Sequence, residues 1–185
     1  MKKIVKWVLI IFVVLFVLLI GIASCSDPST DESSATSEST AEMTPQEIDL
    51  EMYRPVRSAQ ASYEKIQTMM VQLDTGETSL AELYDYCKQV KDWGLDWSNT
   101  IDSVTTDDNA EYAEAAGYYV KGVAYGVASN LMKYIDENDY DSYSGAKDAM
   151  SLLPMYESEI DTTRKAYLSA AGLSEEEIQQ QIDLG

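Results

Sequence analysis

The sequence of 185 residues has no histidine, only two cysteines and few basic residues, and these shortages exclude several classes of protein. Without histidine, the chain cannot build a Ser-His-Asp or Cys-His catalytic pair, nor a histidine-ligated zinc or iron site. The 13 Lys and Arg residues are outnumbered by 32 Asp and Glu residues, which gives a net charge of −19. Because the phosphates of nucleic acid require a basic surface, this composition predicts no nucleic-acid partner.

Sequence motifs for catalysis and metal binding are missing as well. The chain contains no glycine-rich phosphate loop, CxxC pair or nucleophile-elbow pattern. The acidic stretch 136–141 does not fit a calcium loop, because Asp141 stands where glycine is needed and Lys147 where a bidentate glutamate belongs. No Asp or Glu is expected on the apolar stripes of the predicted helices, where burial would raise the pKa of a carboxyl group. We therefore expect no enzymatic activity, no metal site and no cofactor.

The first 24 residues show the three parts of a secretory signal. Lys2, Lys3 and Lys6 form a basic start, residues 7–20 are an unbroken apolar run, and small residues precede Cys25. Because basic residues beside an apolar segment stay on the cytoplasmic side, this pattern predicts that the rest of the chain faces outward.

The tetrapeptide Ile22, Ala23, Ser24 and Cys25 resembles the lipobox of bacterial prolipoproteins, in which an aliphatic residue and two small residues precede a cysteine. The resemblance implies that the Cys25 thiol is alkylated with diacylglycerol, that signal peptidase cleaves between Ser24 and Cys25, and that palmitate labels the protein. Two or three acyl chains give stable anchoring. An uncleaved single-span anchor is the alternative, because residues 4–23 have about the roughly 20 residues needed to cross a bilayer.

Three regions follow from this reading: a signal peptide over 1–24, a tether over 25–43 and a domain over 44–185. The tether is dominated by Ser, Thr and acidic residues and cannot bury enough apolar surface to fold, so we expect a disordered spacer. Cleavage after residue 24 would remove three lysines and no acidic residue, which leaves a net charge of −22. Cys87 then has no intrachain partner, and its place on an apolar stripe predicts a core residue.

Apolar spacing in steps of three and four predicts four long helices and a short C-terminal helix, with no strand. We expect an all-α fold, an antiparallel up-down-up-down four-helix bundle. Capping-box spacing predicts helix starts at Thr44, Ser79, Asp108 and Ser174, with Ser142 or Ser144 opening the fourth helix. Pro55 and Pro154 fall inside the first and fourth helices, where we expect a kink or break.

The third helix carries the candidate binding residues. Gly122 and Gly126 lie beside its valine stripe, and each costs about 1 kcal/mol relative to alanine in a helix. Close approach of a neighbouring helix explains them best, and a groove for a ligand or partner helix is the alternative. Tyr118 and Tyr125, seven residues apart and off the stripe, are the best candidates for exposed binding aromatics.

These features predict a lipoprotein anchored to the extracytoplasmic face of the cell membrane through Cys25. Its helical domain is expected to bind an envelope protein, a peptide or another cell-surface partner without catalysis. The negative charge favours a cationic partner. A surface-exclusion or immunity lipoprotein of a mobile element is the alternative, and such a protein should act through its membrane-proximal face.

Overall fold

The computed structural model describes residues 43–185, and all regular structure in that range is helical. This confirms the all-α prediction for the described part of the chain. The predicted signal peptide, Ser24, Cys25 and nearly all of the tether lie outside it. The helices are α2 (Pro45–Thr75), α3 (Leu80–Val104), η1 (Asp107–Asn109), α4 (Ala110–Lys121), η2 (Gly122–Ala128), α5 (Ser129–Glu137), α6 (Tyr140–Ala170) and α7 (Glu175–Leu184).

Three of the predicted helix starts are confirmed, each as a complete capping box. At Thr44, Ser79 and Ser174 the side chain accepts a hydrogen bond from the backbone N–H of a glutamate three residues on. That glutamate accepts a hydrogen bond from the N–H of the capping residue, at 2.8 Å in each case. Two otherwise unpaired donors are satisfied at each start, which fixes where the helix begins.

Two predicted starts are wrong. The third helix begins at Ala110 after the short helix η1, and Asn109 stands at its N-cap without a side-chain hydrogen bond to the helix. The Asn109 side chain accepts from the Thr106 N–H at 2.8 Å and donates to the Val104 carbonyl at 2.9 Å, so it ties the loop together from a buried position. The fourth helix is capped by Asp139, because this carboxylate reaches the Asp141 N–H, and not by Ser142 or Ser144.

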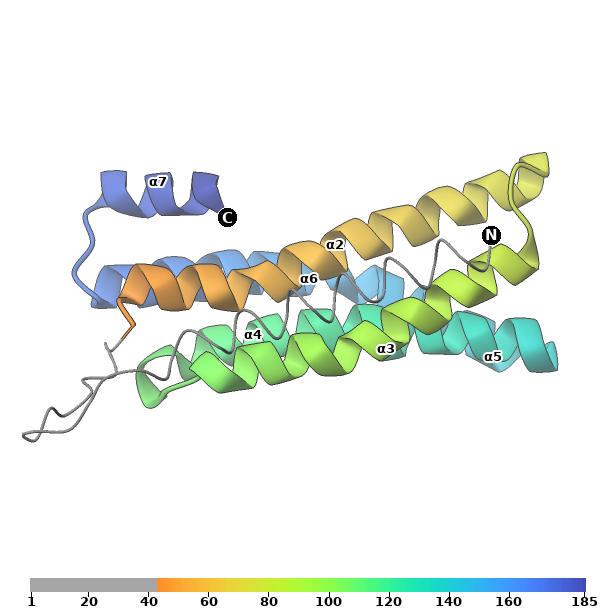
Figure 1. The fold of residues 1–185 in the computed structure, drawn as a ribbon, viewed down its shortest axis with the longest axis horizontal. Coiled ribbons are helices and arrows are strands. Elements are labelled where there is room, and N and C mark those ends of the chain that lie inside the picture. The colour runs from red at the N-terminus through yellow and green to blue at the C-terminus, as the bar shows by residue number, and fades with distance from the viewer. Residues whose placement is uncertain (1–42) are drawn as a thin grey trace, which may run out of the picture. The chain divides into compact units, whose positions relative to one another are not determined.

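The helices pack side by side along their length (Figure 1). α3 lies against α2 and against the continuous helical stretch 110–137, which comprises α4, η2 and α5, and α6 packs on that stretch in turn. The tail helix α7 packs on α6. We call the end where α2 begins, with the loops 105–109 and 171–174, the proximal end. The opposite end, with the loops 76–79 and 138–139, is the distal end.

One apolar core runs through the helices. Met52, Val56 and Ile66 of α2 are fully buried on the predicted stripe, as are Cys87 and Val90 of α3. Burial raises the pKa of the Cys87 thiol to about 12, which keeps it protonated and unreactive, as expected of a core cysteine. No helix within residues 43–185 is long and apolar enough to span a membrane.

The two internal prolines do not break their helices, contrary to one of the expected outcomes. α2 continues through Pro55 and α6 through Pro154, each over 31 residues. Pro55 is buried, with the fully buried Met52 and Ala59 about one turn away on either side. Packing of this kind compensates for the single backbone hydrogen bond that a proline removes.

Candidate functional site

Three of the four candidate residues of the third helix, Gly122, Tyr125 and Gly126, lie in η2, a π-helix of seven residues inside the stretch 110–137; the fourth, Tyr118, lies before it in α4. A π-turn holds more residues than an α-turn and therefore rotates the following side chains. Tyr118 stacks on Tyr156 of α6 with ring centroids 5.9 Å apart. Tyr125, within η2, lies beside Gly94 of α3. Both tyrosines are exposed, as expected, but they face different neighbouring helices.

The two glycines of η2 lie against α6. A Cβ added to Gly126 would come within 2.8 Å of the Ala149 Cβ, and one added to Gly122 would come within 3.0 Å of Leu153. Ala124 approaches Gly94 of α3 too closely for any side chain there. The small residues therefore permit close helix packing on two sides, and the space beside Gly122 and Gly126 is filled by α6.

A buried polar cluster at the proximal end contradicts the expectation that no acidic residue would be buried. The Asp49 carboxylate of α2 accepts two hydrogen bonds, both at 2.8 Å, from the Arg164 guanidinium of α6. Both side chains are almost completely buried. The Gln181 side chain of α7 donates to Asp49 at 3.1 Å, and its backbone carbonyl accepts from Arg164 at 3.1 Å. The cluster joins α2, α6 and α7.

Two aromatic rings enclose this cluster. Tyr53 lies under the Arg164 guanidinium at 3.9 Å, in a cation–π contact. The buried Tyr112 hydroxyl lies near Asp49 but has no partner in hydrogen-bond geometry among the described residues, and its pKa is raised by burial and then by the Asp49 charge. Because the Asp49 and Arg164 charges are paired through two short hydrogen bonds, the cluster serves to hold the helices together.

The spacing of Asp49 and Arg164 in the sequence gives a weak signal for this cluster. Asp49 precedes Met52 by three residues and Val56 by seven, which is the spacing of the apolar stripe. Arg164 follows Ile160 by four in the same way. Opposite charges on the stripes of two helices are therefore the pattern that would have identified the pair.

The acidic stretch 136–141 serves as a helix connection. Asp139 caps α6 and forms an ion pair with Lys133 at 2.9 Å. Hydrogen bonding to Lys133, then to Ser142, lowers the pKa of Asp139 to about 2. Within residues 43–185, no group of three or more His, Cys, Asp or Glu residues is arranged to hold a metal ion.

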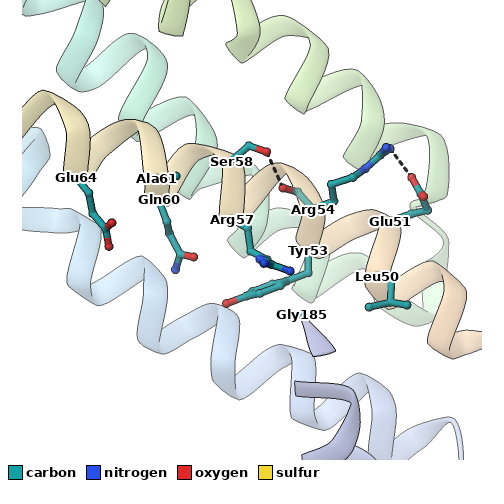
Figure 2. Close-up of a pocket in the computed structure, with 10 residues that line it drawn as sticks. All are labelled: Leu50, Glu51, Tyr53, Arg54, Arg57, Ser58, Gln60, Ala61, Glu64 and Gly185. Atoms are coloured by element: carbon teal, nitrogen blue, oxygen red, sulfur yellow. Dashed lines mark hydrogen bonds and ion pairs between the residues drawn. The ribbon is translucent and has the colours of Figure 1, made fainter. Parts of the chain in front are cut away.

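A surface cavity of about 650 Å³, lined mostly by polar residues, lies along α2 beside Gly185 (Figure 2). Both arginines that line it already have partners. Arg54 forms an ion pair with Glu51 one turn before it, and Arg57 donates to the Leu184 carbonyl at 3.5 Å. Figure 2 shows that nearly all of the wall comes from this single helix. Its lining residues are Leu50, Glu51, Tyr53, Arg54, Arg57, Ser58, Gln60, Ala61, Glu64 and Gly185.

A second cavity, about 420 Å³ in volume, lies at the distal end and is lined by four helices. We call it the distal cavity. Its walls come from the end of α2, the start of α3, the end of α5 and the start of α6, and Asp74 is the one charged residue among them. The lining residues are Met70, Val71, Leu73, Asp74, Leu80, Leu83, Leu131, Tyr134, Ile135 and Tyr143.

The distal cavity has a buried floor and an exposed rim. Leu83 and Leu131 are only 2% exposed, whereas Val71 is 68% and Leu80 53% exposed. Large apolar side chains left open to water beside a concave apolar floor are typical of a binding site. The volume is within the range of about 300–1,000 Å³ that is usual for ligand sites. Sequence reasoning missed this site because its residues come from four separate helices.

No family model, curated protein or solved structure matches the chain.

Proposed function

We propose that this protein is a lipid-anchored, extracytoplasmic binding protein that captures a partner at the distal cavity without catalysing a reaction. The single observation that carries the binding role is the apolar floor of Leu83 and Leu131 beneath the exposed Val71 and Leu80. The lipid anchor rests on the lipobox resemblance of residues 22–25.

The position of the distal cavity suits an anchored protein. The tether would join the domain at Thr44, where α2 begins, and the cavity lies at the other end of this helix of 31 residues. At about 1.5 Å per residue, α2 places the cavity about 40 Å from the point of attachment. A partner could therefore reach the cavity without competing with the membrane surface.

The finer architecture in this proposal is an antiparallel up-down-up-down four-helix bundle. The connections between α2 and α3 and between α5 and α6 are short, which favours antiparallel neighbours. The stretch 110–137 counts as one long helix interrupted by η2, and α7 is an addition that covers the proximal end.

Anchoring is tested by metabolic labelling with radiolabelled palmitate of bacteria that produce the full chain. We expect the label on the protein, and we expect its loss in Cys25→Ala, because the thiol is the proposed attachment atom. Cys87→Ala is the matched control and should keep the label, since that thiol is buried. Label that survives Cys25→Ala would refute the lipid anchor.

Binding at the distal cavity is tested with a photo-crosslinking amino acid placed at Val71 of the full chain in intact cells. The control position is Leu95 on α3, which is similarly exposed at 60% but lies outside the cavity. We expect an adduct of defined mass from Val71 that is absent from Leu95. Equal adducts from the two positions, or none from Val71, would contradict the proposed site.

A further inference from the structure

The acidic residues of the distal end narrow down the partner that the distal cavity can accept. Residues 74–85 and 136–141 contain eight acidic side chains and no Lys or Arg. Glu82 caps α3 and Asp139 pairs with Lys133. The other six are exposed: Asp74, Glu77, Asp85, Asp136, Glu137 and Asp141.

The negative charge of these residues shifts the pKa of a neighbouring side chain. A hydrogen bond to Asp136, together with the charges of Asp136 and Asp85, raises the pKa of the Tyr84 hydroxyl near the start of α3. Asp74 itself lines the cavity.

Lys133 offsets part of this charge, since its pKa is raised by its hydrogen bond to Asp139 and then by the charges of Asp139, Glu137 and Asp141. An apolar floor beside the Asp74 carboxylate, with an excess of exposed carboxylates on the two adjoining connections, is complementary to a ligand that carries apolar groups between positive charges.

We propose that the occupant of the distal cavity is a cationic amphipathic helix of a partner protein, an inference that rests on the binding role proposed above. The walls of the cavity are helices, and residues 43–185 offer no strand edge to which an extended peptide could add. An amphipathic helix fits an apolar groove through side chains at i, i+3, i+4 and i+7. Lys or Arg on its flanks would meet Asp74 and the exposed carboxylates of the two adjoining connections.

A second copy of this chain is a poor occupant by the same reasoning. Two distal ends brought together would place the carboxylates of one copy against those of the other, with no basic residue in either segment to offset them. Cationic flanks on a different protein remove this repulsion and add attraction, so charge selects the partner and the apolar floor holds it.

The test uses the full chain in nanodiscs of zwitterionic lipid, with empty nanodiscs as blank, and measures binding of three synthetic helical peptides by biolayer interferometry. The first peptide has leucines at i, i+3, i+4 and i+7 with flanking lysines. The second replaces the lysines with glutamates, and the third replaces the leucines with serines. We expect binding of the first alone, weakening as salt is raised.

Two double variants of the chain test whether peptide binding depends on the carboxylates of the distal end. Asp74→Asn with Glu77→Gln should weaken binding of the lysine–leucine peptide about two- to thirtyfold, the range expected for two exposed charge pairs. The control, Asp102→Asn with Glu111→Gln, makes the same charge change at the exposed proximal end and should leave binding nearly unchanged. Equal losses in the two variants, or equal binding of the glutamate peptide, would overturn the inference.

The outcomes separate this inference from the proposed function. An adduct from Val71 in cells, without binding of the lysine–leucine peptide, keeps the cavity as a binding site and refutes the cationic helix. Absence of the Val71 adduct refutes the site and the inference together. Self-association of the chain that Val71→Asp abolishes would identify a second copy as the occupant and would also overturn the inference.

Discussion

The two ends of the domain differ in what covers the junction between their helices. At the proximal end, α7 covers the junction of α2 and α6, and Asp49, Arg164 and Gln181 bond to one another in the interior. At the distal end no helix of residues 43–185 covers the junction, and Val71 and Leu80 are exposed above a buried leucine floor. A buried ion pair is costly to desolvate and serves to fix geometry, whereas open apolar surface is costly to leave exposed. The contrast supports the proposal that the proximal end stabilises the fold and the distal end binds a partner.

The largest expected loss of stability comes from breaking the buried polar cluster at the proximal end. Asp49→Ala should lower the free energy of unfolding by about 3–5 kcal/mol, because it leaves the Arg164 charge buried without a partner. Urea unfolding of the full chain in detergent, followed by far-UV circular dichroism, measures this change.

Two further variants sharpen that result. Glu51→Ala removes a carboxylate from an exposed pair on the same helix and should cost no more than about 1 kcal/mol. Asp49→Leu with Arg164→Met removes both buried charges and should recover most of the loss. If Asp49→Ala costs no more than Glu51→Ala, the cluster does not hold the proximal end together.

A smaller, pH-dependent change in the stability of the fold is expected at the distal end. The carboxylate of Asp139 has a pKa of about 2 in the folded chain, below its ordinary value, so its ionised form stabilises the fold. That contribution is complete above about pH 4 and disappears as the pH falls towards 2. Asp139→Asn should therefore lose less stability than the unaltered chain between pH 4 and 2, as measured by urea midpoints at each pH.

The control for the acid effect is Asp141→Asn, whose carboxylate does not pair with Lys133. It should retain the pH dependence of the unaltered chain in that window. An identical response of the two variants would show that the ion pair with Lys133 does not stabilise the α5–α6 connection.

The smallest effect on stability is expected at the rim of the distal cavity. Val71→Ser and Leu80→Ser should each change the free energy of unfolding by no more than about 0.5 kcal/mol, because most of each side chain is already in water. Leu83→Ala, on the buried floor, should cost about 2–5 kcal/mol. Urea unfolding compares the three, and a large loss from Val71→Ser would show that the rim supports the fold.

The helices could be predicted from the sequence where the signal is local. The capping boxes at Thr44, Ser79 and Ser174 depend on residues three apart, and the apolar stripes of α2 and α3 depend on spacing within one helix. Asp139 was missed as a cap because serines nearby offered equally good local candidates.

Features that depend on more than one helix could not be predicted in this way. Asp49 and Arg164 are 115 residues apart, and either alone would be expected on a solvated face. The distal cavity joins segments from residue 70 to residue 143. The π-helix η2 lies where Gly126 packs on Ala149 and Ala124 packs on Gly94, and these contacts between helices cannot be predicted from the sequence around either glycine.

The π-helical segment makes chain length an adjustable property of the third helix. A single residue deleted between 122 and 128 would allow α-helical hydrogen bonding to continue through the segment, as π-turns hold one residue more than α-turns. Because the wide turn absorbs the extra residue, Ser129 to Glu137 would keep nearly the same orientation after this deletion, whereas a deletion within the regular α-helix would turn every following residue by about 100°. Leu131 would therefore stay on the floor of the distal cavity if the residue were lost from η2, but would leave it if the residue were lost from α4.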